Sequence, residues 1–495
     1  MPWRRLAEFT EEVLKKMKKL QRFSYWSLAA IGALFILAAV ILSPISGWGN
    51  AFILPIGFLA GPGLAFCFRR LSFNRSVKKF LNNQNHCLAL ALGATLIMGG
   101  TWLLVSRVEP TVDFDRIYRT AAALAQGGDI PDGAYQAVFP HLLTTPFFLS
   151  LFFRLLGPSV ALAQMINLAL SLVSAALLFF IGKRLLGLSG GLCAGLLWAF
   201  MPSHWMLLSL VCTEPLHIAL TLLSILLFQK ALEGRLILWG ATGSITGLAS
   251  LVRPIGPIYL TAFILCYAVF FRRRGRRSAA VASLALMVAA YIAVTAAGSA
   301  LYGAVLKQPV ASGGFGWNLY VGMSDRGNWN AEDYTLMRER LDAEVYDAPE
   351  IQAMFRDDAL ERLQSRVRDG SIIRLAARKF TQLWCQDSFS VYWLSDGMRE
   401  DSPVDIRAMA GKLSAAANLA YGMLLGLCAL SLLAQIRIRN TAFILPVVLI
   451  IGVALAFILL EANPRYHYAG SAALCLLGAG FRLTPPQYKE RTDCE

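Results

Sequence analysis

Long apolar stretches separated by short polar segments dominate this chain. Apolar runs near the length that crosses a bilayer, about 20 residues in a helix, predict membrane-spanning helices. The sequence therefore predicts an all-α, polytopic membrane protein with about 12 transmembrane helices (11–13). The predicted spans, of which the seventh and twelfth are short, are Tyr25–Leu42, Ala51–Phe68, Cys87–Ser106, Val160–Ile181, Gly191–Leu208, Leu210–Phe228, Leu236–Leu251, Pro254–Phe271, Ala279–Leu301, Leu413–Leu433, Thr441–Leu460 and Tyr466–Phe481.

The distribution of charge between these stretches predicts their orientation. One set of connecting segments contains 26 Lys and Arg but only 7 Asp and Glu. Cytoplasmic loops carry such an excess, so we expect both termini in the cytoplasm and the protein in a cell (plasma or inner) membrane. The segments are 1–22, 69–86, 182–190, 229–235, 272–277, 435–440 and 482–495.

The net charge of +15 then reflects topology and attraction to anionic membrane lipids. It does not predict a nucleic-acid partner, because the basic clusters are short loops between helices. Hydrophobic residues make up 56% and charged residues 16% of the chain, against about 25% charged in soluble domains. The nine cysteines show no CxxC spacing, so neither a disulfide framework nor a zinc site is predicted.

The segment 136–157 is apolar enough to span the membrane. A span here would move every later loop to the opposite side and place RRRGRR, 272–277, outside, against the charge rule. Pro140 and Pro146 also interrupt a helix. We therefore expect a re-entrant or surface-lying piece, with a thirteenth span as the alternative.

These patterns divide the chain into four regions. The long polar loop has charged and apolar residues at helical spacing between 330 and 379, which predicts amphipathic helices over the outer face of the bundle. The expected regions are an N-terminal cytoplasmic amphipathic stretch with two extra transmembrane helices (1–86), a transmembrane core with its first outer loop at 107–159 (87–301), an extracytoplasmic cap (302–412), and C-terminal transmembrane helices with a short cytoplasmic tail (413–495).

The hexapeptide DFDRIY, Asp113 to Tyr118, opens the first outer loop. Acidic residues at the mouth of a membrane bundle are costly to desolvate and indicate function. One acid would deprotonate a hydroxyl while the other holds a divalent cation or orients a substrate. The structural alternative is that Asp113 and Asp115 cap a helix, with Asp115 paired to Arg119 at i,i+4.

VDFDRIYRTAAALAQGG resembles the first outer loop of GT-C glycosyltransferases, the polytopic enzymes related to protein mannosyltransferases and to aminoarabinose and galacturonic-acid lipid A transferases. Five further stretches resemble this group in the same order, together spanning roughly 87–482, although the group often has a doubled proline where this chain has Phe139-Pro140. They are AVFPHLLTTPFFLSLFFRLLGPS, MPSHWMLLSLVCTEP, GLASLVRPIG, the pair GWNLYVGMSDRGNWNAED and FSVYW, and NPRYHY.

The resemblance implies transfer of a sugar from a polyprenyl-phosphate donor to a lipid, glycan or protein acceptor at the outer face. It makes Asp113 the candidate base, with Asp115 as helper or as ligand of a divalent cation such as Mg or Mn. Cations would bind the leaving phosphate. We assign that role to residues in the Arg-Pro and Arg-Tyr-His motifs, namely Arg253, Arg465, Tyr466 and His467.

Structural alternatives stand beside these roles. Arg253 would also serve as a snorkelling anchor at a helix end. Glu461 and Arg465 would also form a pair that fixes the turn between two spans. Glu214, in a proline-rich outer turn, would contact sugar hydroxyls or merely cap a helix.

The stretch Gly313–Gly322 is rich in glycine and aromatic residues. It lacks the strand-then-helix context of a nucleotide-binding loop. Trp317, Asn318 and Tyr320 suit stacking on a sugar and hydrogen bonding to it. Other aromatic residues of the late outer loop would instead form an interfacial belt. These are Trp384, Tyr392 and Trp393.

Two other functions remain as alternatives to a glycosyltransferase. A transporter or flippase of lipid-linked sugars would show an inverted repeat and charges at the midplane, whereas here no repeat is evident and the charges cluster on one side. A non-catalytic membrane scaffold of the same fold is the second alternative.

Overall fold

The structure, a computed structural model, describes residues 2–46, 48–72, 74–271, 277–343, 345–438 and 444–481. Within these ranges the chain forms helices and no strand, apart from one isolated bridge between Val108 and Met398. The predicted all-α class is confirmed.

Six helices of the described ranges are long and apolar enough to cross a membrane, so the protein is a multi-pass membrane protein. A seventh span results if the pair α9 (Leu188–Phe200) and α10–η3 (Pro202–Ser209), bent by 57°, counts as one. The six lie within α1 (Pro2–Ile41), α2 (Trp48–Ser72), α4 (Gln84–Val105), α8 (Val160–Leu186), α14 (Arg277–Leu306) and α20 (Ile406–Ile438).

Helices also form at the other predicted spans, but they are shorter. Pro215 and Pro257 occupy the first turn of α11 and α13, where a missing N–H is tolerated. The preceding residues, which the hydrophobic pattern had placed in helices, form irregular turns instead. The total of about 12 spans stays a prediction. The shorter helices are α11 (Glu214–Ala231), α12 (Leu236–Val252), α13 (Gly256–Cys266, followed by a π-helical turn η4, Tyr267–Phe271), α21 (Ile444–Leu459) and α22 (Tyr468–Gly478).

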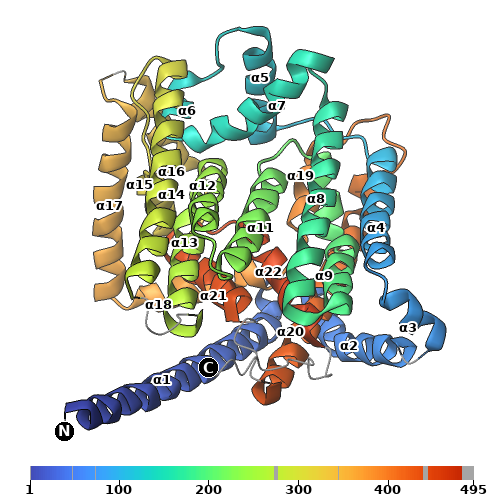
Figure 1. The fold of residues 1–495 in the computed structure, drawn as a ribbon. Helices are drawn as coiled ribbons and strands as arrows, with labels where there is room; N and C mark the ends of the chain where they lie inside the picture. Colours follow the sequence, from blue (N-terminus) through green and yellow to red (C-terminus); the bar gives the residue numbers. More distant parts are fainter. Residues whose placement is uncertain are drawn as a thin grey trace.

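The first outer loop folds into a separate layer across one end of the bundle, at the top of Figure 1. The 13 residues of α7 cover about 20 Å, less than the roughly 30 Å of a bilayer core. This geometry supports a surface-lying segment at 136–157 and not a thirteenth span. The layer consists of α5 (Val112–Gln126), α6 (Gly133–Val138), η2 (Pro140–Leu143) and α7 (Thr144–Leu156), with α7 packed on α5.

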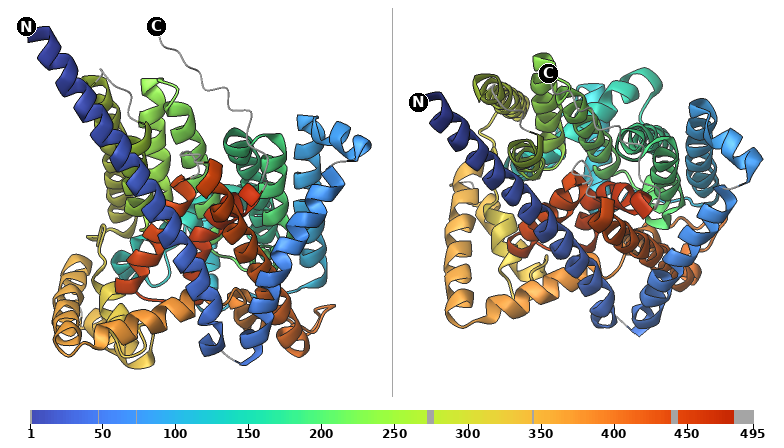
Figure 2. Two further views of the ribbon diagram at one scale, coloured as in Figure 1. Left: turned by 90° about the horizontal axis from the view of Figure 1, so that it is seen from below. Right: turned by 60° about the horizontal axis from the view of Figure 1, so that its bottom comes forward.

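The long polar loop forms the predicted amphipathic helices. Those between 316 and 368 pack around a small core that includes Trp317 and Phe355, whereas those between 371 and 396 contribute Trp384 and Leu394 to the main core of the bundle. In the left view of Figure 2 these cap helices lie at the end of the molecule opposite to the start of α1. This placement agrees with the predicted separation between the N-terminus and the cap. The helices are α15 (Gly316–Gly322), α16 (Ala331–Asp342), α17 (Ala348–Arg368), α18 (Ser371–Trp384) and α19 (Phe389–Asp396).

The two helices that precede the resemblance pack on the C-terminal part of the bundle. Gly57 and Gly61 of α2 face Gly422 and Gly426 of α20, and a Cβ on Gly57 would lie 3.1 Å from the Cα of Gly422. Small residues allow helix backbones to approach closely in membranes. A short helix, α3 (Arg75–Leu81), then connects α2 to α4.

Candidate active site

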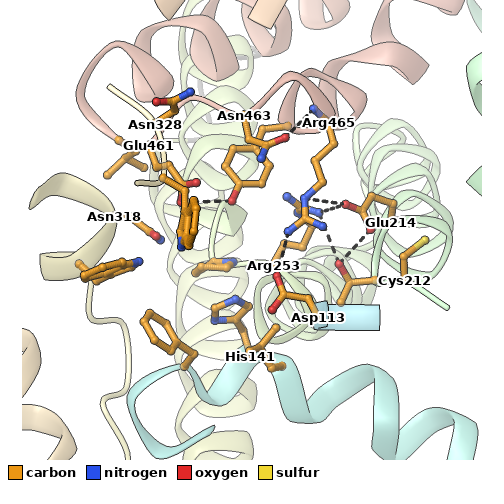
Figure 3. A pocket seen from close by; sticks show the side chains of 18 of the residues that line it. Asp113, His141, Cys212, Glu214, Arg253, Asn318, Asn328, Glu461, Asn463 and Arg465 are labelled. Atoms are coloured by element: carbon orange, nitrogen blue, oxygen red, sulfur yellow. Dashed lines mark hydrogen bonds and ion pairs between the residues drawn. The ribbon is translucent and has the colours of Figure 1, made fainter. Parts of the chain in front are cut away.

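A cavity of about 610 Å³ lies where one end of the helix bundle meets the α5–α7 layer and the cap. Its walls include the first turn of α5, η2, the turns that precede α11 and α13, α15 with the loop after it, and the turn from α21 to η6 (Pro464–His467). Six segments that are distant in sequence thus meet at one place (Figure 3).

One side of this cavity, here called the arginine half, consists of Asp113, Arg116, Glu214, Arg253 and Arg465. Arg116 donates a hydrogen bond to Asp113 at 2.9 Å, and Arg253 donates one to Glu214 at 2.5 Å. Arg465 lies between the two carboxylates, 3.6 Å from Asp113 and 3.9 Å from Glu214 (Figure 3). The arginine half therefore holds one more cation than it holds anions.

Local chain chemistry explains where these side chains point. Asp113 and Arg116 are three residues apart in the first turn of α5, a spacing that brings side chains together. Arg253 ends α12 in an extended conformation because a proline follows it. Arg465 lies in η6, where the Asn463 side chain accepts a hydrogen bond from the Arg465 N–H at 3.2 Å. Each arginine thus lies at a helix terminus that the sequence defines.

The other side of the cavity, here called the amide half, consists of Asn318, Asn328, Trp329, Glu461 and Asn463. In Figure 3 its four labelled residues lie apart from Glu214 and Arg253. The Glu461 N–H donates to the Asn318 carbonyl at 2.7 Å, which joins the turn after α21 to the cap. This half therefore depends on correct docking of the cap.

Tyr466 connects the two halves. Its hydroxyl donates to Glu461 at 3.3 Å, and the Arg253 guanidinium lies 5.1 Å from the centre of its ring. Burial raises the pKa of the Glu461 carboxyl above its usual range, although the charge of Arg465 opposes this shift. Glu461 consequently favours its protonated form more than an exposed glutamate does.

His141 of η2 also lines the cavity. Burial, together with the positive charge of Arg253, lowers the pKa of its imidazole to about 4. The ring is therefore neutral near pH 7, where it can both donate and accept a hydrogen bond. It suits contact with a hydroxyl better than contact with a phosphate.

Seven of the ten predicted site residues line the cavity. The predicted Glu461–Arg465 pair does not form, because Glu461 bonds Tyr466 and Arg465 pairs with carboxylates on other elements. Arg253 likewise forms an ion pair with Glu214 and does not act only as a snorkelling anchor. The seven are Asp113, Glu214, Arg253, Trp317, Asn318, Arg465 and Tyr466.

Three predicted site residues point elsewhere. Asp115 pairs with Arg119 at 2.8 Å, as its structural alternative predicted. His467 is buried, and its Nε2 lies 2.8 Å from Asp387. Tyr320 packs in the cap core under Arg362, with 3.5 Å between guanidinium and ring centre. Two residues of separation is about 200° on an α-helix and about 240° on a 3₁₀ turn, so Asp115 and His467 turn away from Asp113 and Arg465.

Four residues of the cavity were not predicted from the sequence, and Glu461 was predicted only as a pairing partner. The four are Arg116, His141, Asn328 and Trp329. A signal existed for Arg116, which lies one turn after Asp113 within the DFDRIY motif. It also existed for His141, which follows the proline of a motif. Asn328 and Trp329 belong to the resembling stretch GWNLYVGMSDRGNWNAED, but nothing in its pattern distinguishes them from their neighbours, and docking of the cap brings them to the cavity.

These residues do not fit a divalent cation. Asp113 and Glu214 are the carboxylates that a cation would bridge, and guanidinium groups already occupy the space around both. Asp115, the predicted ligand, faces Arg119. Among the residues that the structure describes, no group of three His, Cys, Asp or Glu side chains is arranged to hold a metal ion.

Comparison with known proteins supports the resemblance seen in the motifs. The sequence model of the dolichyl-phosphate-mannose-protein mannosyltransferase family matches residues 140–297. This match confirms the resemblance to GT-C membrane glycosyltransferases. No curated protein sequence matches the chain.

Solved structures with a similar fold include two of the oligosaccharyltransferase from Archaeoglobus fulgidus. AglB in complex with an inhibitory peptide and a dolichol-phosphate gives a TM-score of 0.44 at 13% identity, covering 80% of this chain and 50% of AglB. The complex with Zn and sulfate gives 0.41 at 12%, covering 79% and 48%. This chain thus spans about half the length of the archaeal protein. ArnT from Cupriavidus metallidurans bound to undecaprenyl phosphate gives 0.32 at 14%, covering 79% and 77%.

Proposed function

We propose that this protein is a membrane glycosyltransferase that moves a sugar from a polyprenyl-phosphate-linked donor to an acceptor at the extracytoplasmic face. The observation that carries the proposal is the arginine half of the cavity, where three arginines face two carboxylates. A sugar linked through one phosphate carries a single negative charge. That charge would balance the surplus arginine in a site largely withdrawn from water.

An apolar groove of about 670 Å³ supports a lipid-linked donor. It lies between α1, α13 and α21, and its lining includes Leu28, Ile258 and Ile451. Helix α13 begins at Gly256, three residues after Arg253, and α21 ends at Leu459, shortly before the turn that carries Arg465. The same two helices therefore connect the phosphate end of the cavity to an apolar surface suited to an isoprenoid chain.

In the proposed reaction, an acceptor hydroxyl oxygen attacks the anomeric carbon while the carbon–oxygen bond to the phosphate breaks. The phosphate leaves with the bonding electrons, and the arginine half stabilises its charge. Asp113 takes the hydroxyl proton. Its side chain is 37% exposed, so an acceptor can reach it. Attack opposite the phosphate inverts the anomeric centre.

The finer assignments belong to the same proposal. Trp317, Asn318 and Glu214 would contact the sugar or the acceptor, and the acceptor would be an envelope lipid, glycan or protein. Both termini would be cytoplasmic, in the cell membrane. The four regions with boundaries after 86, 301 and 412 would correspond to N-terminal helices, transmembrane core, cap and C-terminal helices.

The test uses the full chain in nanodiscs with undecaprenyl phosphate carrying a radiolabelled glucose, incubated with an envelope extract as acceptor source. We expect label to move to a product and unlabelled undecaprenyl phosphate to form in equal amount. Binding of undecaprenyl phosphate alone is measured in parallel. Failure to bind it would overturn the proposal. Movement of intact donor between leaflets of a vesicle, without transfer, would favour a flippase.

A further inference from the structure

The two halves of the cavity differ in the ligand chemistry that they offer. The arginine half presents guanidinium groups and carboxylates, whereas the amide half presents three asparagines, an indole and one carboxyl group. Figure 3 shows Glu461, Asn318 and Asn328 together on one side. Amides and carboxyl groups match hydroxyls, and an aromatic face suits a sugar ring. Trp329 is 54% exposed, so its indole is accessible.

Glu461 is fixed at the centre of the amide half. Its N–H donates to Asn318, and the next N–H, of Ala462, donates to the Gly327 carbonyl at 2.8 Å. The Glu461 residue is only 7% exposed, and its oxygen accepts from Tyr466. The cap and the bundle thus hold this carboxyl group in place from two sides.

Charges near Glu461 are already engaged. Lys379 of α18 uses its ammonium group to donate hydrogen bonds to the carbonyls of Gly322 at 2.9 Å and Ile458 at 2.7 Å. It does not line the cavity. Among the described residues, none forms an ion pair with Glu461 within 4.0 Å, and the arginines of the cavity pair with Asp113 and Glu214. The amide half itself therefore contains no cation, and Arg465, whose charge acts on Glu461, is engaged with Asp113 and Glu214.

We infer that the amide half receives the transferred sugar and that Glu461 selects a sugar without a negative charge. The inference rests on the proposed function, because it needs the phosphate in the arginine half. A uronic acid would bring a second carboxylate beside Glu461, and the two groups would have to share one proton in a buried site. Burial already raises the pKa of the Glu461 carboxyl because little water is left to stabilise its charge, so a second negative charge in the same place would be still less stable.

The test compares two donors that differ only in one exocyclic group, undecaprenyl-phosphate glucose and undecaprenyl-phosphate glucuronic acid. Binding to the full chain in nanodiscs is measured for both and for undecaprenyl phosphate alone. We expect the glucosyl donor to bind about tenfold or more tightly than the glucuronosyl donor, since like charges that face each other are strongly unfavourable.

Three variants make the test specific. Glu461→Gln keeps the shape but supplies N–H donors, so it should reduce the preference for glucose about tenfold. Asn328→Lys adds a cation to the amide half and should also improve glucuronosyl binding, which keeps the test valid if Glu461→Gln fails to fold. Glu339→Gln removes a carboxylate from an exposed position of α16, outside the cavity, and should leave the preference unchanged.

The outcomes separate the inference from the proposed function. Equal or tighter binding of the glucuronosyl donor by the wild-type chain, with intact binding of undecaprenyl phosphate, overturns the inference alone. An unchanged preference in folded Glu461→Gln would likewise overturn the role of Glu461. Loss of undecaprenyl phosphate binding in the wild-type chain would instead overturn the proposed function.

Discussion

Replacing Arg465 by alanine tests the arginine half most directly. Arg465 connects the α5–α7 layer to the helix bundle, because its partner Asp113 lies on α5 and its partner Glu214 lies on α11. Its guanidinium is nevertheless the more distant partner of both carboxylates. Asp113 keeps Arg116 at 2.9 Å and Glu214 keeps Arg253 at 2.5 Å after the substitution. We therefore expect the variant to fold.

The expected loss lies in donor binding. Removing one charge-assisted hydrogen bond to a phosphate costs about 1.5–3 kcal/mol, which is about ten- to a hundredfold in affinity. The arginine half also loses its surplus cation and becomes neutral before the donor binds. A donor with one negative charge then enters without a compensating charge, so the upper part of this range is expected.

The assay is equilibrium binding of undecaprenyl phosphate in nanodiscs, with thermal unfolding measured on the same samples. Arg399→Ala is the matched control, because Arg399 also holds two carboxylates, Glu109 at 2.6 Å and Asp401 at 2.8 Å, but lies half-exposed outside the cavity. Unchanged affinity in a folded Arg465→Ala variant would refute the assignment of this half to phosphate.

Three further predictions follow from the same structure. Asp113→Asn should lower the rate of sugar transfer about 10²- to 10⁴-fold, because it removes the general base. Asp115→Asn should leave activity, because Asp115 faces Arg119. Wild-type turnover by Asp113→Asn would contradict the catalytic role of Asp113. Lys379→Met should leave two buried carbonyls unpaired and cost about 1–3 kcal/mol for each, seen as a lower melting temperature; an unchanged melting temperature would contradict this. A reporter after Gly275 should indicate cytoplasm and one at Ala348 the outside, and an outside signal at Gly275 would reverse the topology.

The fold could be predicted from the sequence where one physical rule dominates. Apolar length and the loop charges predicted helices and the separation of the cap from the N-terminus. The predicted starts of α11 and α13 came a few residues too early. The apolar sequence continues through 210–213 and 254–255, but each helix begins only next to its proline. The two turns that precede α11 and α13, where the prediction was wrong, are also the turns that line the cavity.

The arginine half could be predicted because each of its helix-terminal residues belongs to a recognisable local motif. The amide half could be predicted only in part, because Asn318 was a candidate sugar contact whereas nothing within GWNLYVGMSDRGNWNAED distinguishes Asn328 and Trp329 as site residues. These residues reach the cavity through long-range backbone bonds, such as the one from Ala462 to Gly327. Which cap residues reach the cavity thus depends on how the cap docks on the bundle and not on the local sequence pattern.

Arg465 and His467 illustrate why a motif predicts a place better than a role. Both belong to NPRYHY, and both are polar residues between apolar helices. The 3₁₀ geometry of η6 sends Arg465 toward the cavity and His467 into the bundle, where Asp387 holds it at 2.8 Å and in turn accepts from Ser203. The loop that carries Asp387 and helix α10 therefore hold the turn on the side away from the cavity. Since phosphate binding requires Arg465 to stay between two carboxylates, this buried His467–Asp387 contact serves the same site by positioning the turn that carries the arginine.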